Sequence, residues 1–211
     1  MSLWLSRIAL NPMSGRAIRL AGDLEQLHAT LYALFSNAER GRVLFRIDNP
    51  NGFPVVIIQS ASEPHWNDLK LEPTDLIAVP ESKPFDFSPL TGAEYAFRLL
   101  ARPTHRLATG KENPNGKRRD LRTDEERLNW LRRKSESSGF KVLSCGLTIL
   151  NLPAIKSGRQ FRQPGGSFSA VQFDGILTVT DPDKLREAVA NGIGTQKAYG
   201  FGLLSLARLC E

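Results

Sequence analysis

The stretch Gly192-Ile-Gly-Thr-Gln-Lys-Ala-Tyr-Gly-Phe-Gly202 joins a predicted helix to the last predicted strand, and closes the second of two β-α-β-β-α-β patterns in the chain. It holds four of the chain's 17 glycines. Glycine adopts positive φ and lets backbone N–H groups approach a ligand closely, so such loops suit the phosphates of a nucleotide cofactor or a nucleic acid. A plain helix-to-strand turn has the same composition, and the stretch alone does not separate these interpretations.

Two nucleotide-binding motifs can be tested against this stretch. A Walker loop requires glycine, four residues, and then Gly-Lys-Ser/Thr, but Lys197 follows Gln196 and precedes Ala198. A dinucleotide fingerprint requires Gly-x-Gly-x-x-Gly between a first strand and a helix, but Lys197 occupies the third glycine position and the loop follows a helix. Both motifs fail, and no cofactor is expected.

The residues before this loop predict the second pattern. Thr123 and Glu126 form a capping box that opens a helix to about Ser138, and Asp181-Pro182 caps a shorter helix that ends at Asn191-Gly192. Apolar runs and alternation predict strands at residues 95–99, 140–151, 171–180 and 201–209. The polar stretches between these elements are basic, at residues 117–119 and 153–167.

The first half repeats the element order without repeating the sequence. Asp23 with Gln26 begins a helix that ends near Asn37. Strands are predicted at residues 3–10, 43–47, 55–58 and 76–79, a loop at 11–22 and a short helix at 64–70. This order is the split β-α-β pattern of a ferredoxin-like domain.

The chain is therefore predicted to be an α+β protein with two tandem ferredoxin-like (RRM-like) domains. The first domain covers residues 1–79, a Pro-rich linker covers 80–93, and the second domain covers 94–211.

Charge is distributed unevenly between the halves. The net charge is +6 with a sequence pI of about 9.6, yet residues 1–90 carry −2 and residues 91–211 carry +8. A basic half suggests a polyanionic partner, although basic surfaces also serve solubility.

The absence of a long apolar run or a signal-peptide core predicts a cytoplasmic protein with no membrane partner. Cys145 and Cys210 are isolated, which predicts reduced thiols and no zinc site.

Three histidines are the candidates for proton transfer. His28 lies within the apolar stripe of the first helix, either as a core histidine or at the helix edge facing a groove. His65 and His105 are predicted to lie on the surface. No metal-ligand spacing or Gly-x-Ser-x-Gly elbow is present. Metal-free phosphodiester cleavage is easy only for RNA, whose 2′-OH is a built-in nucleophile, so a basic protein of this kind points to RNA.

Several stretches resemble the CasE family, the CRISPR RNA-processing endoribonucleases of the type I-E Cascade system. The resemblance runs essentially end to end. Its carriers are Leu5-Ser-Arg-Ile-Ala-Leu-Asn-Pro12, Asp23-Leu-Glu-Gln-Leu-His28, Phe97-Arg-Leu-Leu-Ala-Arg-Pro103, Asn129-Trp-Leu-Arg132, Phe173-Asp-Gly-Ile-Leu177 and, most specifically, the glycine-rich loop continued by Leu203-Leu-Ser205.

The resemblance implies cleavage of the CRISPR repeat RNA hairpin at the 3′ base of its stem, leaving a 2′,3′-cyclic phosphate, by a protein that stays with other Cascade subunits. It implies that His28 is catalytic. The family often has a tyrosine three residues before this histidine, where this chain has Glu25; Tyr32 or Tyr199 could compensate. The predicted RNA-binding residues are Arg16, Arg19, Lys156, Arg159, Arg162, Gly192, Gly194 and Lys197.

Two other functions stay open at this point. The first is a non-catalytic RNA-binding subunit that retains guide RNA, which the departure at Glu25 keeps open. The second is a generic RNA-recognition module, although the strands lack its aromatic signature.

Overall fold

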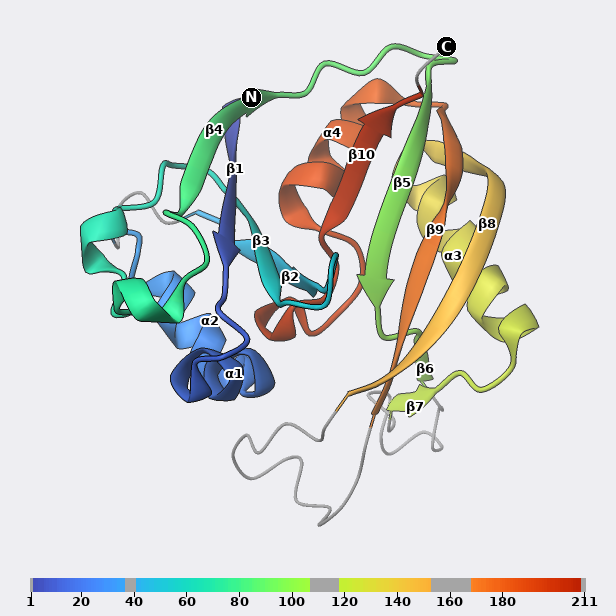
Figure 1. Cartoon of the computed structure of the whole chain (residues 1–211). Coiled ribbons are helices and arrows are strands. Elements are labelled where there is room, and N and C mark those ends of the chain that lie inside the picture. The colour runs from blue at the N-terminus through green and yellow to red at the C-terminus, as the bar shows by residue number, and fades with distance from the viewer. Residues whose placement is uncertain (1, 37–40, 107–117, 153–167, 210–211) are drawn as a thin grey trace, which may run out of the picture.

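The computed structural model describes residues 2–36, 41–106, 118–152 and 168–209. The chain forms a mixed α/β fold with two four-stranded antiparallel sheets that stand side by side, one from each half (Figure 1). Within the described ranges, no helix is long and apolar enough to cross a membrane.

The first half builds a sheet with the strand order β2-β3-β1-β4. Its elements are β1 (Ser2–Ala9), α1 (Gly15–Gly22), α2 (Leu24–Tyr32), β2 (Leu44–Asp48), β3 (Val55–Ser60), the 3-10 turns η1 (Trp66–Asp68) and η2 (Pro73–Asp75), and β4 (Glu81–Asp86). Both helices pack their apolar side chains against one sheet face, with Leu27 and Leu31 of α2 buried against Phe45 and Ile58. This burial stabilises two helices that would be too short to persist alone.

Several predictions in the first half are wrong. The helix predicted to end near Asn37 ends at Tyr32. The predicted loop at residues 11–22 contains α1, which Ser14 caps by accepting a hydrogen bond from the Ala17 N–H at 3.2 Å. The predicted strand at 76–79 is not formed, and a single bridge joins Leu10 to Leu76. Instead β4 completes the sheet inside the predicted linker, pairing with β1. Pro84 is compatible with β4 because this strand lies at the sheet edge.

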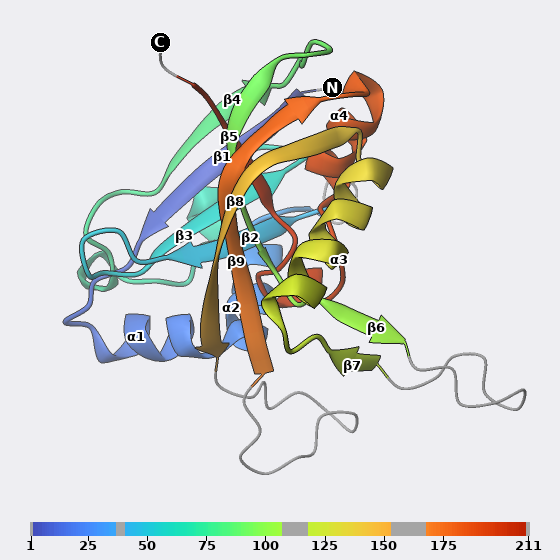
Figure 2. The ribbon, with the colours of Figure 1, turned by 90° about the vertical axis from the view of Figure 1, so that its right-hand side faces the viewer.

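The second half builds a sheet with the strand order β10-β5-β9-β8. Its elements are β5 (Glu94–Ala101), the hairpin strands β6 (Thr104–Arg106) and β7 (Arg118–Asp120), α3 (Asp124–Ser137), β8 (Phe140–Leu152), β9 (Phe168–Val179), α4 (Pro182–Asn191), the 3-10 turn η3 (Lys197–Tyr199) and β10 (Leu204–Arg208). Figure 2 shows α3 running along β8.

The predicted caps of α3 and α4 are confirmed, including the reciprocal Thr123–Glu126 box. Arg118 and Arg119, predicted as part of a loop, belong to β7.

The halves are packed together beyond their covalent connection. Leu3 of β1 and Phe87, just after β4, belong to the apolar core of the second half. The Gln59 side chain of β3 donates a 2.6 Å hydrogen bond to the Val189 carbonyl of α4. The second half therefore supports the first sheet on the face opposite α1 and α2.

Candidate catalytic site and nucleic-acid interface

His28 lies on α2, half-buried at the edge of the helix face that enters the core. The helix begins at Asp23, whose carboxylate accepts a hydrogen bond from the Gln26 N–H at 3.0 Å. One turn after His28, Tyr32 places its ring centroid 4.0 Å from the imidazole, and Phe45 of β2 lies at 6.4 Å. The aromatic contacts hold the imidazole on the helix edge, where it keeps access to solvent.

The glycine-rich loop (residues 192–202) of the second half lies against this helix. Its turn η3 contacts both α2 and β2. Gly200 has φ +79°, and a Cβ added there would lie 3.2 Å from the Phe45 ring. Tyr199 of the loop and Leu24 of α2 both pack against the small apolar cluster that contains Phe201. The loop and His28, more than 160 positions apart in sequence, are therefore neighbours in space.

Close packing against neighbouring side chains explains why the first two glycine positions of the loop have little room for a Cβ. Gly192 ends α4 with φ +74°, and a Cβ added there would lie 2.9 Å from both Leu44 methyl carbons. Gly194 has φ +89°, and its added Cβ would lie 3.3 Å from the Trp130 ring of α3. These contacts are with protein groups, and RNA contact by either glycine stays a prediction.

Lys197 opens η3 and is half-buried. A Cβ added at Gly202 would lie 3.3 Å from its Cγ, so the lysine stem lies over that glycine. Burial lowers the pKa of Lys197, and the charges of Arg42 and Lys134 lower it further. Sequence reasoning missed Arg42 and Lys134, because only the folded loop brings their segments together.

The other predicted RNA-binding residues are separate from this cluster. Arg16 is held on α1 by its own half: it donates to the Lys70 carbonyl and lies 3.6 Å from the Asp75 carboxylate. Arg19 lies exposed on the same helix. The predicted residues Lys156, Arg159 and Arg162 lie outside the described residues.

The remaining candidates from the sequence also have defined places. Glu25 is exposed in the first turn of α2, three residues before His28. The His65 N–H donates to the Leu34 carbonyl at 2.8 Å. His105 lies in the hairpin strand β6, opposite Arg119 of β7.

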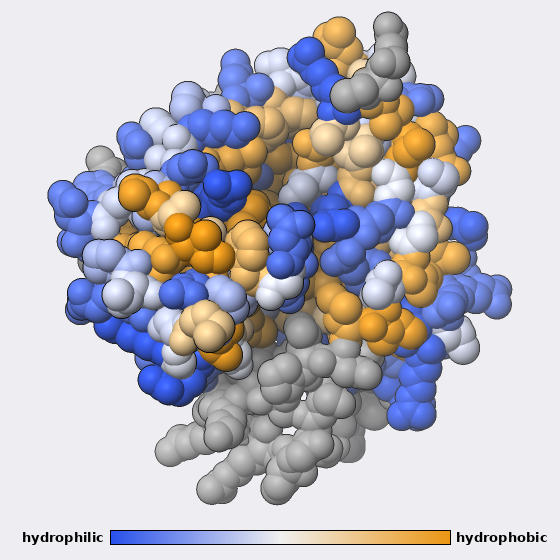
Figure 3. All heavy atoms as spheres, in the orientation of Figure 1, coloured by the Kyte–Doolittle hydropathy of each residue, from blue (hydrophilic) through white to orange (hydrophobic). Residues whose placement is uncertain are grey.

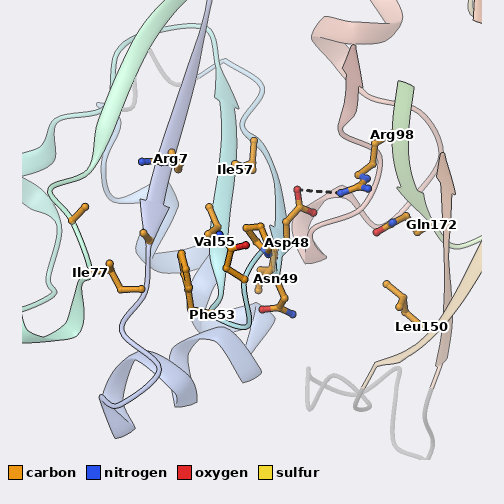
Figure 4. A pocket seen from close by; sticks show the side chains of 15 residues that line it. Arg7, Asp48, Asn49, Phe53, Val55, Ile57, Ile77, Arg98, Leu150 and Gln172 are labelled. Atoms are coloured by element: carbon orange, nitrogen blue, oxygen red, sulfur yellow. Dashed lines mark ion pairs between the residues drawn. The ribbon is translucent and has the colours of Figure 1, made fainter. Parts of the chain in front are cut away.

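A cleft of about 690 Å³ opens between the two sheets. Figure 4 shows Arg7 and Asp48 on its first-half wall and Arg98 and Gln172 on its second-half wall. Arg98 bridges the halves, with its guanidinium 2.6 Å from the Asp174 carboxylate and 4.0 Å from that of Asp48. On this face of the molecule, polar side chains run between two apolar areas (Figure 3).

Among the described residues, no three His, Cys, Asp or Glu side chains are grouped so that they could hold a metal ion. Cys145 of β8 is a free thiol, and burial raises its pKa to about 11. Cys210 lies outside the described ranges.

Comparison with known proteins gives consistent matches over nearly the whole chain. A family model described as CRISPR associated protein matches residues 3–208. The CRISPR-associated endoribonuclease Cse3 of Thermus thermophilus is 34% identical, covering 97% of this chain and 100% of that protein. The Cascade subunit CasE of Escherichia coli is 30% identical over 89% of this chain and 93% of that protein.

Solved structures agree with these matches. A structure of Cse3 bound to a 19-nucleotide RNA superposes with a TM-score of 0.82 at 33% identity, covering 98% of each chain. The crystal structure of Cas6e from Escherichia coli gives a TM-score of 0.68 at 30% identity, covering 99% of this chain and all of that one.

Proposed function

Because the chain belongs to the family of CRISPR-associated proteins that includes Cse3 and CasE, we propose that it is a CRISPR RNA-processing endoribonuclease. It binds the repeat hairpin of precursor CRISPR RNA and cuts at the 3′ base of the stem. The observation that carries this function is the juxtaposition of His28 on α2 with η3 of the glycine-rich loop. One half supplies a group that can transfer protons, and the other supplies a cation on the turn that packs against the helix of this group.

The strand orders support two ferredoxin-like domains. In both sheets the first strand lies between the third and the fourth, and the second strand lies at the edge beside the third. This arrangement follows from two split β-α-β units. The first domain would then extend to the end of β4, at Asp86, rather than end at residue 79.

The chemistry proposed for His28 needs only the RNA and the protein. The ribose 2′-OH attacks the adjacent phosphorus, the bond to the 5′-oxygen of the next nucleotide breaks, and a 2′,3′-cyclic phosphate remains. His28 accepts the proton of the 2′-OH or donates one to the leaving 5′-oxygen, since imidazole can do either near neutral pH. Tyr32 keeps the ring in place, and Lys197 offers a positive charge to the phosphate backbone.

A single substitution tests this assignment. We expect His28→Ala to lower the single-turnover cleavage rate of the repeat RNA by roughly 10²–10⁴-fold while hairpin binding is retained. His65→Ala is the matched control, because His65 is an exposed histidine at the start of η1 and is not part of the proposed site. Cleavage should also continue in EDTA. Undiminished cleavage by His28→Ala would exclude His28 as the catalytic group.

Glu25 supports a second candidate, an RNA-binding subunit that does not cleave. Its carboxylate is exposed three residues before His28, and a negative charge there would repel a phosphate approaching the imidazole. Solved structures that resemble this chain include a CRISPR RNA-guided surveillance complex, with 25% identity and a TM-score of 0.59. Incubation of the wild-type protein with its repeat RNA separates the candidates: tight binding without any cut product would favour the second.

A further inference from the structure

We propose that Arg42, Lys134 and Lys197 form one binding site for a backbone phosphate of the RNA strand that passes His28. The inference rests on the proposed function and deepens it. It names two residues, Arg42 and Lys134, that the sequence did not single out, and it assigns them a ligand of defined chemistry.

The packing of the glycine-rich loop brings the three segments together. Gly194 lies over the Trp130 ring, and Lys134 follows Trp130 by one turn on the same side of α3. Gly192 lies against Leu44, two residues after Arg42. Lys197 begins the turn that packs on α2 and β2. The loop thus touches α3 on one side and the start of β2 on the other, with a cation on each of the three segments.

Within the described ranges, other cations of the chain have carboxylate partners, and the three cations of this cluster do not. Arg98 lies 2.6 Å from the Asp174 carboxylate and Arg102 lies 2.7 Å from that of Asp120. Across the described residues, no carboxylate forms an ion pair with any member of the cluster. Like charges held together without a counter-charge raise the free energy of the unliganded protein, and a bound anion removes that cost.

The titration of Lys197 agrees with this geometry. Its pKa is lowered by burial first, and then by Arg42 and Lys134, so both cations are close enough to act on the ammonium group. Water and salt screen charges that are exposed and far apart, so the effect of both cations on Lys197 agrees with their closeness to it.

The position of the cluster selects a nucleic-acid phosphate as the ligand. Lys197 lies on the turn that packs against the helix of His28, so a strand bound at this cluster would run close to that helix. A guanidinium and two ammonium groups suit the oxygens of a phosphate, which accept several charge-assisted hydrogen bonds at once. An RNA strand crossing the cluster would carry its neighbouring phosphates toward His28.

The test measures binding of a repeat hairpin that cannot be cut, because the cleaved nucleotide carries a 2′-deoxyribose. The proteins compared are the wild type, Arg42→Gln, Lys134→Gln, the double variant and Lys83→Gln. Lys83 is an exposed lysine of β4, the outer strand of the first sheet, and is the matched control for loss of one charge. Each protein is titrated at several salt concentrations, and thermal unfolding checks that all are folded.

We expect each single variant to weaken binding about ten-fold at low salt and to reduce the slope of log K against log salt by about 0.7–0.9. If both cations hold the same phosphate, the double variant differs from the product of the single effects. Lys83→Gln should match the wild type. The NMR-detected pKa of Lys197 should rise in Lys134→Gln, since a repelling charge is removed.

Three results would overturn the proposal. If the variants bind the uncleavable hairpin like Lys83→Gln, while the wild type binds it and cuts the all-ribose hairpin, the phosphate site is wrong and the proposed function stands. An unchanged Lys197 pKa in both single variants would show that the cations do not form one cluster. A wild-type protein that fails to bind the hairpin at all would overturn the proposed function and this site together.

Discussion

Burial shifts the pKa values of two side chains in the second half in opposite directions for one physical reason. Low polarity disfavours the charged form, so it lowers the pKa of the Lys197 ammonium and raises that of the Cys145 thiol. At Lys197 neighbouring cations add to the effect of burial, and at Cys145 the Asp174 carboxylate does. The two shifts have different consequences, because the lysine lies at a proposed ligand site and the thiol lies on a strand of the second sheet.

The Cys145 thiol should therefore react slowly with alkylating reagents at neutral pH. In a Cys210→Ser background, we expect the iodoacetamide rate to keep rising through pH 9 toward pH 11, since the pKa is raised from 9.0 to about 11. Between these values the folded state holds a proton that the unfolded state has lost. The stability contributed by the thiol is thus fully present below pH 9 and lost as pH rises through 11. A rate that levels off near pH 9 would contradict the shift.

At the scale of elements, local sequence signals such as helix caps predicted the helices well. They predicted poorly the elements that form only by pairing with a distant strand. The caps at Asp23, Thr123 and Asp181 begin helices where the sequence placed them. The strand β4 escaped prediction because its identity depends on pairing with β1, where Trp4 faces Pro84 across the sheet. Helix α1 escaped because it has only 8 residues and both begins and ends with glycine, at Gly15 and Gly22, which is typical of a loop. For the site, residue types were predictable, but the contact between α2 and η3 was not.

The turn that follows η3 offers a test of this contact. Gly200→Ala should cost about 1–2 kcal/mol of folding free energy from its φ of +79°, and should also push on Phe45, whose ring lies near His28. We expect single-turnover cleavage to fall at least about ten-fold, since small displacements of catalytic groups are costly.

Gly92→Ala is the control for the folding free energy that is lost because alanine disfavours a positive φ. Gly92 has φ +80°, and no atom lies within 4 Å of an added Cβ. Gly200→Ala should lose at least as much thermal stability as Gly92→Ala, and Gly92→Ala should cleave like the wild type. Equal cleavage by the two variants would mean that the packing of Gly200 on Phe45 does not position His28.

At the scale of the whole molecule, the proposed site depends on how the two halves are held. Besides apolar packing, a polar network joins β2 to β10. Arg46, only 4% exposed, donates two hydrogen bonds to Asp48 at 2.7 and 2.9 Å and a third to the Ser205 hydroxyl at 3.0 Å. The sequence predicted two domains and a linker, but it carried no signal for which sheet edges meet, because these contacts join residues about 160 positions apart.

We expect Arg46→Met to loosen this junction. The substitution leaves the Asp48 carboxylate with Arg98 at 4.0 Å as its remaining ion-pair contact, so the free energy of unfolding should fall by roughly 3–5 kcal/mol. The cleavage rate should fall by a larger factor than the affinity for the hairpin. His28 and η3 belong to different halves, and only the chemical step requires both to keep their relative positions.

Arg102→Met provides the comparison that separates this effect from general destabilisation. Arg102 makes the same kind of two-point contact, at 2.7 and 2.9 Å to Asp120, but within the second half alone. It should lower stability while the fraction that remains folded cleaves at the wild-type rate. Single-turnover rates at saturating protein, measured well below the melting temperature, compare the two variants. If both cleave equally well, the active geometry does not depend on the Arg46 junction, and the apolar contacts of Leu3 and Phe87 with the second core are sufficient to align the halves.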